Sequence, residues 1–444
     1  MIAEHAASTS GLWIWNARAL DPASGTIVEP AAIEIVGGRI ISVGRACGDA
    51  PEGAIDVGGR VVLPGLVDAH VHLSSDLSRS PGFGPARELK GEDPRPSELR
   101  WFVLAASCRA FLQAGFTTVR DVGAFDDEAL VMRRAVDLDL VPGPRIRTCG
   151  RIVSATAPGG RIFGTMYEQA DGPWATRRAV RRQLQRGADF IKMMATGARS
   201  VEREDTESPQ FTREEMEAIV DEAHRIGLRV AAHAEGLEGT RVAIESGADT
   251  IEHGLALHRA PDLLAAMAKR GQVLVPTLST FHDLAERFTS EWVPRLVDQA
   301  KRQLEEAYLT LVAAGKAGVT MAMGFDSGPP GANAWELVRM AEGGLGSMAA
   351  LAAATSGGAA ALGLPELGRL QRNAIADLVV LDGDPVKDVR DLLDRSRVRL
   401  VIQNGTAVAG SDLDGPVMGN SEAIPGDQPD RKDRLEVTAS AADS

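Results

Sequence analysis

The sequence predicts an α/β protein built on a TIM-type (β/α)8 barrel. Between residues 66 and 365, short apolar segments alternate with helical segments, a pattern typical of βα units around a parallel sheet. Eight strands can be counted, the number that closes such a barrel. The expected strands are Gly65–Leu73, Thr117–Val122, Arg145–Thr148, Phe190–Met194, Arg229–His233, Thr250–His253, Val273–Pro276 and Thr320–Phe325.

The helix pattern is best marked at Arg213–Ile226, where Thr212 and Glu215 form a capping box and Gly227 ends the helix. A doubly wound open sheet is the rival architecture. No GxGxxG or Walker-type glycine loop follows any of the expected strands, which removes the commonest reason for that sheet.

Two strand-rich stretches flank the barrel. Residues 1–65 and 366–412 contain short apolar runs separated by turn dipeptides such as Gly37-Gly38 and Asn404-Gly405. We expect these two pieces to form one small composite β-sandwich. Residues 413–444 contain few large apolar residues and predict a disordered tail.

Composition and charge limit the partners. The 444 residues are 44% hydrophobic and carry a net charge of −13, so the average field repels nucleic acids and anionic membrane surfaces. The chain shows neither a secretory signal nor an apolar stretch long enough to cross a bilayer. Three widely spaced cysteines fit a reducing compartment, so we expect a cytoplasmic protein without nucleic-acid or membrane partners.

Two histidines mark the first expected strand of the barrel. His70 and His72 are two residues apart, so both imidazoles can lie on the same side of a strand and face one metal ion. Hydrogen-bonded core histidines are the alternative explanation, and residues elsewhere in the chain are needed to decide.

Further polar residues end later strands. His233, His253 and Asp326 each close an apolar strand, and Lys192 lies within another. Barrel active sites form where the carboxyl ends of the strands meet, so these residues indicate a catalytic site. Burying a lysine is energetically unfavourable unless its amine is paired or chemically altered. The alternative explanation is that Lys192 extends its amine to the rim of the barrel.

In their order along the chain, these residues resemble the amidohydrolase superfamily. The match consists of HxH after the first strand, Lys after the fourth, His after the fifth and sixth, and Asp after the eighth. The surrounding words are similar to its imidazolonepropionase-like and Xaa-Pro dipeptidase-like branch: Leu63–His72, Ala231–Gly236, Ile251–Gly254 and Gly324–Gly328. The resemblance covers most of the chain, to about residue 405.

The resemblance implies a centre of two divalent metal ions. Zinc is the preferred metal, and cobalt and manganese are the alternatives. It implies that Lys192 is carboxylated and bridges both ions. It further implies that His70, His72 and Asp326 hold one ion and that His233 and His253 hold the other. Metal-activated hydroxide would attack a carbonyl, with Asp326 as general base and acid. Homo-oligomer formation is implied by the resemblance alone.

Departures from the branch's usual pattern narrow the substrate. Arg161 stands where the dipeptidase-like members usually have a histidine, and Glu235 stands where they often have a tyrosine or histidine. Glu235 would repel a dipeptide carboxylate, although Arg161 and Arg199 could compensate. The words Ser154–Gly164 and Ala195–Glu202 are similar to the phenylurea and thiocarbamate (molinate) hydrolases.

We therefore expect hydrolysis of a C–N bond in a small neutral amide, urea or (thio)carbamate. The alternatives are an Xaa-Pro dipeptidase, another N-acyl amino acid or peptide amidohydrolase, and a non-catalytic barrel that binds metal or ligand. Asp121 is expected behind the metal ligands, or alternatively in a structural salt bridge. Further candidates for substrate contact are Phe163, Met166, Trp174, His258 and Phe281.

Overall fold

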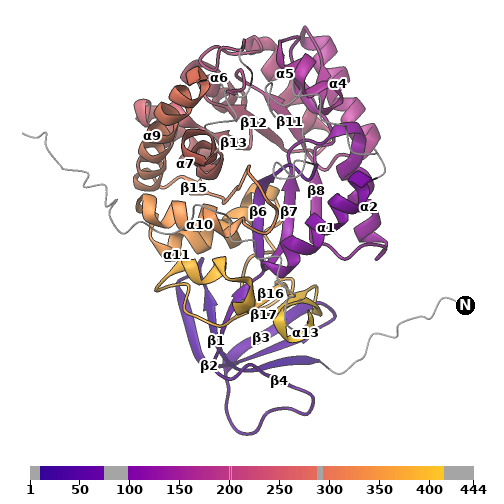
Figure 1. The fold of residues 1–444 in the computed structure, drawn as a ribbon, viewed down its shortest axis with the longest axis vertical. Helices are drawn as coiled ribbons and strands as arrows, with labels where there is room; N and C mark the ends of the chain where they lie inside the picture. Colours follow the sequence, from indigo (N-terminus) through magenta and orange to yellow (C-terminus); the bar gives the residue numbers. More distant parts are fainter. Residues whose placement is uncertain (1–10, 75–98, 200, 202, 288–293, 415–444) are drawn as a thin grey trace, which may run out of the picture.

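The computed structural model of the protein describes residues 11–74, 99–199, 201, 203–287 and 294–414. Figure 1 shows a large region of strands covered by helices above a smaller strand-rich region. Strands from both ends of the chain meet in the smaller region, and the middle of the chain forms the larger one.

The smaller region is an eight-stranded mixed sheet in the order β18-β17-β16-β5-β1-β2-β3, with β4 paired to β1. It joins the two ends of the chain because β5 pairs antiparallel with β16, with Val62 opposite Val380. Its strands are β1 (Leu12–Asp21), β2 (Thr26–Val36), β3 (Arg39–Arg45), β4 (Ile55–Asp56), β5 (Val61–Pro64), β16 (Leu378–Leu381), β17 (Val398–Gln403) and β18 (Thr406–Ala409).

Strands β5 and β16 are buried on both faces. Val62 and Val380 belong to the core of the small sheet, whereas Leu63 and Val379 belong to a cluster shared with the helices of the large region. Alternate side chains of a strand point to opposite faces, so these two strands tie the two regions together. This explains why their sequences are uninterrupted runs of apolar residues.

The large region contains two parallel sheets. One has the order β10-β9-β11-β12-β13-β14-β15 and the other β6-β7-β8. Their strands are β6 (Leu66–Val71), β7 (Phe116–Asp121), β8 (Arg145–Thr148), β9 (Ile152–Ser154), β10 (Tyr167–Gln169), β11 (Ile191–Met194), β12 (Val230–Ala234), β13 (Thr250–His253), β14 (Val273–Val275) and β15 (Thr320–Met321). Strands β9 and β10 were not expected from the sequence.

Backbone hydrogen bonds link the two edge strands of the three-stranded sheet to residues next to β15 and β11 of the seven-stranded sheet. The amide of Ala69 donates to the carbonyl of Met323 (2.8 Å), and Asp189 donates to Thr148 (2.8 Å). The paired strands of the described residues do not form a continuous closed ladder. Strand β15 ends at Met321 instead of the expected Phe325 because the amide of Met323 donates to Ala353, in a helical segment outside both sheets.

Helices surround the parallel strands (Figure 1). They are α1 (Leu99–Gln113), α2 (Glu128–Asp137), α3 (Gly159–Phe163), α4 (Pro173–Arg186), α5 (Arg213–Arg225), α6 (Leu237–Ser246), α7 (Pro261–Arg270), α8 (Leu278–His282), α9 (Pro294–Lys316), α10 (Ala334–Met340), α11 (Ser347–Ala352) and α12 (Gly358–Leu362). The capping box of α5 is confirmed: Thr212 accepts from the amide of Glu215, whose carboxylate accepts from the amide of Thr212.

Part of the expected tail is structured. Residues 413 and 414 belong to helix α13 (Ser411–Asp414), and residues 415–444 lie outside the described residues. Within the described part of the chain, no helix has both the length and the apolar character that crossing a membrane requires.

Candidate metal centre

His70 and His72 lie at the carboxyl end of β6 and direct their Nε2 atoms toward one carboxylate. His70 Nε2 is 3.6 Å and His72 Nε2 is 3.5 Å from Oδ1 of Asp326. His70 is buried, and the His72 side chain is 20% exposed. The expected alternation therefore brings both rings to one side, where they meet an aspartate more than 250 residues later in the chain.

Hydrogen bonds at Nδ1 orient both rings. Nδ1–H of His70 donates to Oε2 of Glu252 (2.7 Å), and Nδ1–H of His72 donates to the carbonyl of Gly123 (2.8 Å). A neutral imidazole carries only one proton, so these bonds leave the Nε2 lone pairs directed at Asp326. Burial lowers the pKa of His70 to about 4, which keeps this ring neutral at physiological pH.

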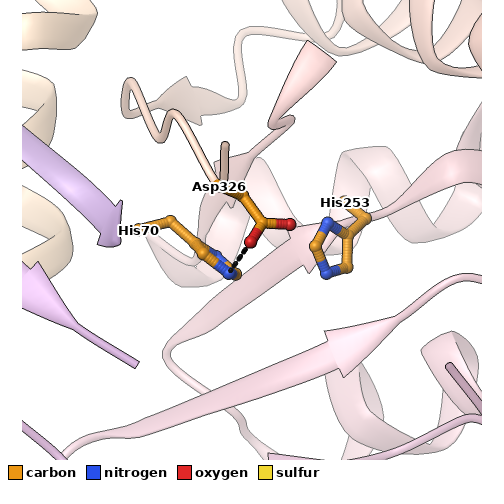
Figure 2. A group of neighbouring side chains, drawn as sticks. All are labelled: His70, His253 and Asp326. Carbon is orange, nitrogen blue, oxygen red and sulfur yellow. Dashed lines mark ion pairs between the residues drawn. The ribbon is translucent and has the colours of Figure 1, made fainter. Parts of the chain in front are cut away.

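His70, His253 and Asp326 form a compact group of potential metal ligands. One ligand atom from each lies within 4.8 Å of the other two. Figure 2 shows the Asp326 carboxylate between the two imidazoles, with its ion pair to His70 dashed. Imidazole nitrogen and carboxylate oxygen are ligands that zinc and similar divalent ions accept.

His233 and His253 face each other across the ends of β12 and β13. His253 Nε2 lies 3.0 Å from His233 Nδ1, and His253 Nδ1 contacts the hydroxyl of Thr277 at 2.7 Å. Burial, followed by the neighbouring His233, places the pKa of His253 well below its ordinary value. Two ring nitrogens this close can hold a shared cation.

Three residues around the centre have left-handed backbone conformations. They are His253 (φ 68°), Thr277 (φ 48°) and Asp326 (φ 41°). This conformation is unfavourable for residues other than glycine, costs roughly 1–3 kcal/mol each and is concentrated at functional sites. In β13 it also explains how the consecutive residues Glu252 and His253 both reach the same centre.

Lys192 lies in β11, and its side chain is buried. The side chain is 2% exposed, and its Nζ has no hydrogen-bond partner among the described residues. Burial lowers the pKa of Lys192 to about 8. An unpaired buried amine is costly, so this residue fits the carboxylated lysine implied by the resemblance: carboxylation would replace the amine with an anionic oxygen ligand.

Glu252 and Arg120 support the centre from behind, and the sequence analysis did not single them out. Nη2 of Arg120 donates to Oε1 of Glu252 (2.7 Å), and its Nε donates to the carbonyl of Ala69 (2.5 Å). Both side chains are almost fully buried. Although burial opposes ionisation of Glu252, Arg120, Lys192 and His70 outweigh it and keep the pKa of this carboxyl well below its usual value.

Asp121 ends β7 and organises backbone amides. Its carboxylate accepts from the amides of Leu73 (2.8 Å) and Gly123 (3.2 Å) and from the hydroxyl of Thr148 (3.0 Å). Gly123 is the residue whose carbonyl accepts from His72. Asp121 therefore holds the backbone segment that accepts from His72, and its hydrogen bonds among the described residues come from two amides and a hydroxyl.

Arg199 pairs with Glu235, which is the compensation that the sequence left open. Oε1 of Glu235 accepts from Nη1 of Arg199 (2.8 Å), and its Oε2 accepts from Gln303 (2.7 Å). The same guanidinium donates from Nη2 to Asp326 (3.1 Å). The charge of Glu235 is therefore compensated inside the protein. Burial opposes ionisation, but Arg199 and then His233 keep the pKa of Glu235 below its ordinary value.

Among the other candidates for substrate contact, only Phe281 joins the centre. It is fully buried, its ring meets the ring of His253 edge-on at 6.1 Å, and the Arg199 guanidinium lies over it at 4.5 Å. The remaining candidates have other surroundings: Phe163 and Met166 pack in a core cluster, His258 contacts Leu255 and Thr310, Arg161 is exposed, and Trp174 is 85% exposed on α4.

Residues 61–408 match the family model described as "Amidohydrolase family". The chain belongs to the amidohydrolase family. This membership implies a TIM-type barrel with an additional domain, and it agrees with the resemblance found in the sequence.

Three relatives of this amidohydrolase illustrate the range of substrates. Ochratoxinase from Aspergillus niger is 30% identical over 388 residues, covering 80% of this chain and 77% of the relative. A prolidase complexed with N-methylphosphonate-L-proline is 31% identical, with a TM-score of 0.80 and coverage of 90% and 100%. Molinate hydrolase, at 23% identity, TM-score 0.73 and coverage of 90% and 95%, shows likeness of fold alone.

Proposed function

We propose that this amidohydrolase is a metal-dependent enzyme that hydrolyses a C–N bond of a small molecule. The observation that carries the proposal is the convergence of His70 and His72 on Asp326, together with the buried amine of Lys192, which has no hydrogen-bond partner among the described residues. His70 and His72 lie at the carboxyl end of a parallel strand, where barrel enzymes place their active sites. We also propose that the two parallel sheets close into a (β/α)8 barrel around the centre.

We propose that the cofactors are two divalent metal ions, with zinc as the preferred metal. His70, His72 and Asp326 would hold one ion, His233 and His253 the other, and a carboxylated Lys192 would bridge them. When bound, such ions lower the pKa of water and polarise a carbonyl group. The unpaired Nζ of Lys192 and the close nitrogens of His233 and His253 support this assignment.

In this proposal Asp326 transfers the proton. Burial opposes its ionisation, but His70, Arg199 and His72 together lower the pKa of Asp326 below its ordinary value. Asp326 is therefore a carboxylate at neutral pH and can accept a proton from the attacking water and pass it to the leaving nitrogen. The backbone bond from Asp326 to the carbonyl of His70 (2.9 Å) keeps this carboxylate beside β6.

For the substrate we propose a small neutral amide, urea or (thio)carbamate. Arg199 already bonds two carboxylates, Glu235 and Asp326, so its positive charge is compensated inside the protein. A substrate carboxylate would gain no attraction from it.

A second candidate is hydrolysis of an Xaa-Pro dipeptide or another N-acyl amino acid. It is favoured by the structural likeness to the prolidase, at 31% identity over nearly the whole of both chains. It is also favoured by the pairing of Glu235 with Arg199, because this pairing compensates the charge of Glu235.

A substrate panel tests the proposal. N-aryl ureas, thiocarbamates, N-acyl amino acids and Xaa-Pro dipeptides are each assayed with zinc, cobalt and manganese. We expect metal-dependent release of an amine that is fastest with a neutral substrate. Turnover of dipeptides alone would reverse the ranking of the two candidates. Metal binding without turnover of any substrate would favour the non-catalytic barrel. We also propose that the protein forms a homo-oligomer. Light scattering on the same preparation measures its oligomeric state.

A further inference from the structure

Arg199 lies beside Asp326 in the candidate centre, on the loop that follows β11. Its side chain is only 10% exposed. The guanidinium donates from Nη1 to Glu235 (2.8 Å) and from Nη2 to Thr280 (2.7 Å) and Asp326 (3.1 Å), and its flat face lies over the ring of Phe281. Contacts in several directions fix the position of this group.

Part of the donor capacity of Arg199 is unused. A guanidinium has five N–H groups, and three hydrogen bonds to side-chain acceptors are present. Nε is buried and has no hydrogen-bond partner among the described residues. Burying a donor without a partner is unfavourable, so a second observation, besides proximity to Asp326, points to an acceptor that the described residues do not supply.

Glu235 holds the guanidinium in place. Glu235 is 2% exposed, and its second oxygen accepts from Gln303 on α9. Its backbone amide donates to the hydroxyl of Thr196 (3.1 Å), on the segment that leads from β11 to Arg199. The charged fork of Arg199 is therefore fixed before any ligand arrives, as is required of a group that stabilises a transition state.

We propose that Arg199 is a catalytic residue that donates a hydrogen bond to the scissile carbonyl oxygen as negative charge develops on it. The inference rests on the proposed hydrolysis. In the addition step, water oxygen bonds to the carbonyl carbon, the water proton moves to Asp326, and the π electron pair of C=O moves onto oxygen. When this intermediate collapses, the C–N bond breaks and Asp326 returns the proton to nitrogen.

The charges around Arg199 favour this role over permanent binding of an anion. Before the reaction, Arg199 faces two carboxylates, Glu235 and Asp326. Once Asp326 has accepted the proton, one of these charges is gone and a new one has appeared on the substrate oxygen. The attraction of Arg199 for the substrate is therefore greater in the transition state than in the ground state, which accelerates the reaction.

Chemical rescue of Arg199→Ala tests the proposal. Two of the substrates, N-benzoylglycine and N-benzoylglycinamide, share the same benzoyl C–N bond and differ in one carboxylate. The third is the fastest substrate of the panel. Benzoate release is measured for the wild type, Arg199→Ala, Arg199→Lys and Arg372→Ala, an exposed arginine of the small region that serves as control. Added guanidinium is compared with methylammonium at equal concentration.

We expect kcat of Arg199→Ala to fall by roughly 10²- to 10³-fold, as on removal of one oxyanion donor, with a smaller change in KM. Guanidinium should restore part of kcat and methylammonium should not, because only guanidinium has the planar fork. Arg199→Lys should fall between the wild type and Arg199→Ala. The Arg372→Ala control should match the wild type.

Three results would overturn the assignment. An unchanged kcat in Arg199→Ala would exclude a catalytic role. A higher KM for N-benzoylglycine, with no other change, would indicate that Arg199 binds the substrate carboxylate. A loss without guanidinium rescue, accompanied by a lower thermal unfolding midpoint in both Arg199 variants, would make its role structural. Absence of turnover by the wild type on every substrate would instead contradict the proposed function, and so the two failures are distinguishable.

Discussion

Oε2 of Glu252 lies 2.7 Å from Nδ1 of His70, and its other oxygen pairs with Arg120. The carboxylate thus fixes the proton of His70 on Nδ1 and directs the Nε2 lone pair toward Asp326. Partners behind metal-binding histidines commonly contribute 10- to 100-fold to metal affinity, by order of magnitude. Glu252 therefore belongs functionally to the candidate metal centre, although it is not expected to be a ligand.

We predict that Glu252→Gln weakens zinc binding by about 10- to 100-fold. The amide keeps the shape of the side chain but loses the charge that favours Nδ1–H on His70. Zinc affinity is measured by competition with a chelator, and Glu217→Gln, at an exposed position of α5, serves as control. Equal affinity in Glu252→Gln and the wild type would contradict this role.

Asp326→Asn should abolish hydrolysis and leave the fold intact. The amide cannot accept the proton of water, so we expect kcat to fall by at least roughly 10²- to 10⁴-fold. Because the side chain keeps its size, the far-ultraviolet circular dichroism spectrum should match that of the wild type. Turnover near the wild-type rate in the Asn variant would refute general-base catalysis by Asp326.

Lys192→Met should leave the metal-free protein stable but weaken metal binding. The pKa of Lys192 is lowered to about 8 from an ordinary value of 10.5, so the folded metal-free protein binds fewer protons than the unfolded chain between these values. Its stability should therefore rise with pH across this window. Lys192→Met lacks this dependence and should be at least as stable below pH 8.

Urea unfolding of the metal-free proteins at pH 7, 8 and 9.5 measures the effect, and zinc content of the reconstituted proteins measures binding. We expect the Met variant to retain less zinc than the wild type. A variant that is clearly less stable than the wild type at pH 7, yet binds as much zinc, would show that Lys192 has a structural partner.

Glu222 provides a pH-dependent contact between α4 and α5. Its carboxylate bonds Arg181 (2.8 Å) on α4 and Arg225 on α5, which lower the pKa of Glu222 to about 2. The folded state therefore binds fewer protons than the unfolded state between pH 2 and 4.5, so this stabilisation is present above pH 4.5 and is lost as pH falls toward 2.

Glu222→Gln should reduce the free energy of unfolding by about 1 kcal/mol at pH 7, because the arginine heads are exposed and solvent screens the pair. The difference from the wild type should shrink between pH 4.5 and pH 3. Urea unfolding at these pH values measures it, with Glu217→Gln as the control on the same helix. A difference that is constant with pH would exclude an ionic contribution.

Several strands and the shared side of His70 and His72 could be predicted because each depends on a local pattern. His70 and His72 share a side of β6 through strand alternation, and His233 and Asp326 follow apolar runs that end at the same edge. Apolar runs also predicted β8 and β13 with their observed bounds. Each of these predictions requires knowledge of a single segment only.

The supporting contacts could not be predicted in the same way. Glu252 precedes His253, and strict alternation would place the two on opposite sides; the left-handed backbone of His253 breaks that rule. The pairing of Arg199 with Glu235 joins residues 36 positions apart through a loop whose path no local pattern specifies. The early end of β15 could not be predicted from a local pattern either, because the backbone amide of Met323 donates to the carbonyl of Ala353 in a distant segment.

Metal content and the chemical state of Lys192 test the central claim most directly. Elemental analysis of wild-type protein reconstituted with zinc and bicarbonate gives the number of ions per chain, and the carbonyl region of a ¹³C spectrum after labelling with ¹³C-bicarbonate detects a carbamate. We predict two ions per chain and a carbamate signal that is absent in Lys192→Met. One ion or none, with no carbamate in the wild type, would contradict the binuclear centre proposed for this amidohydrolase.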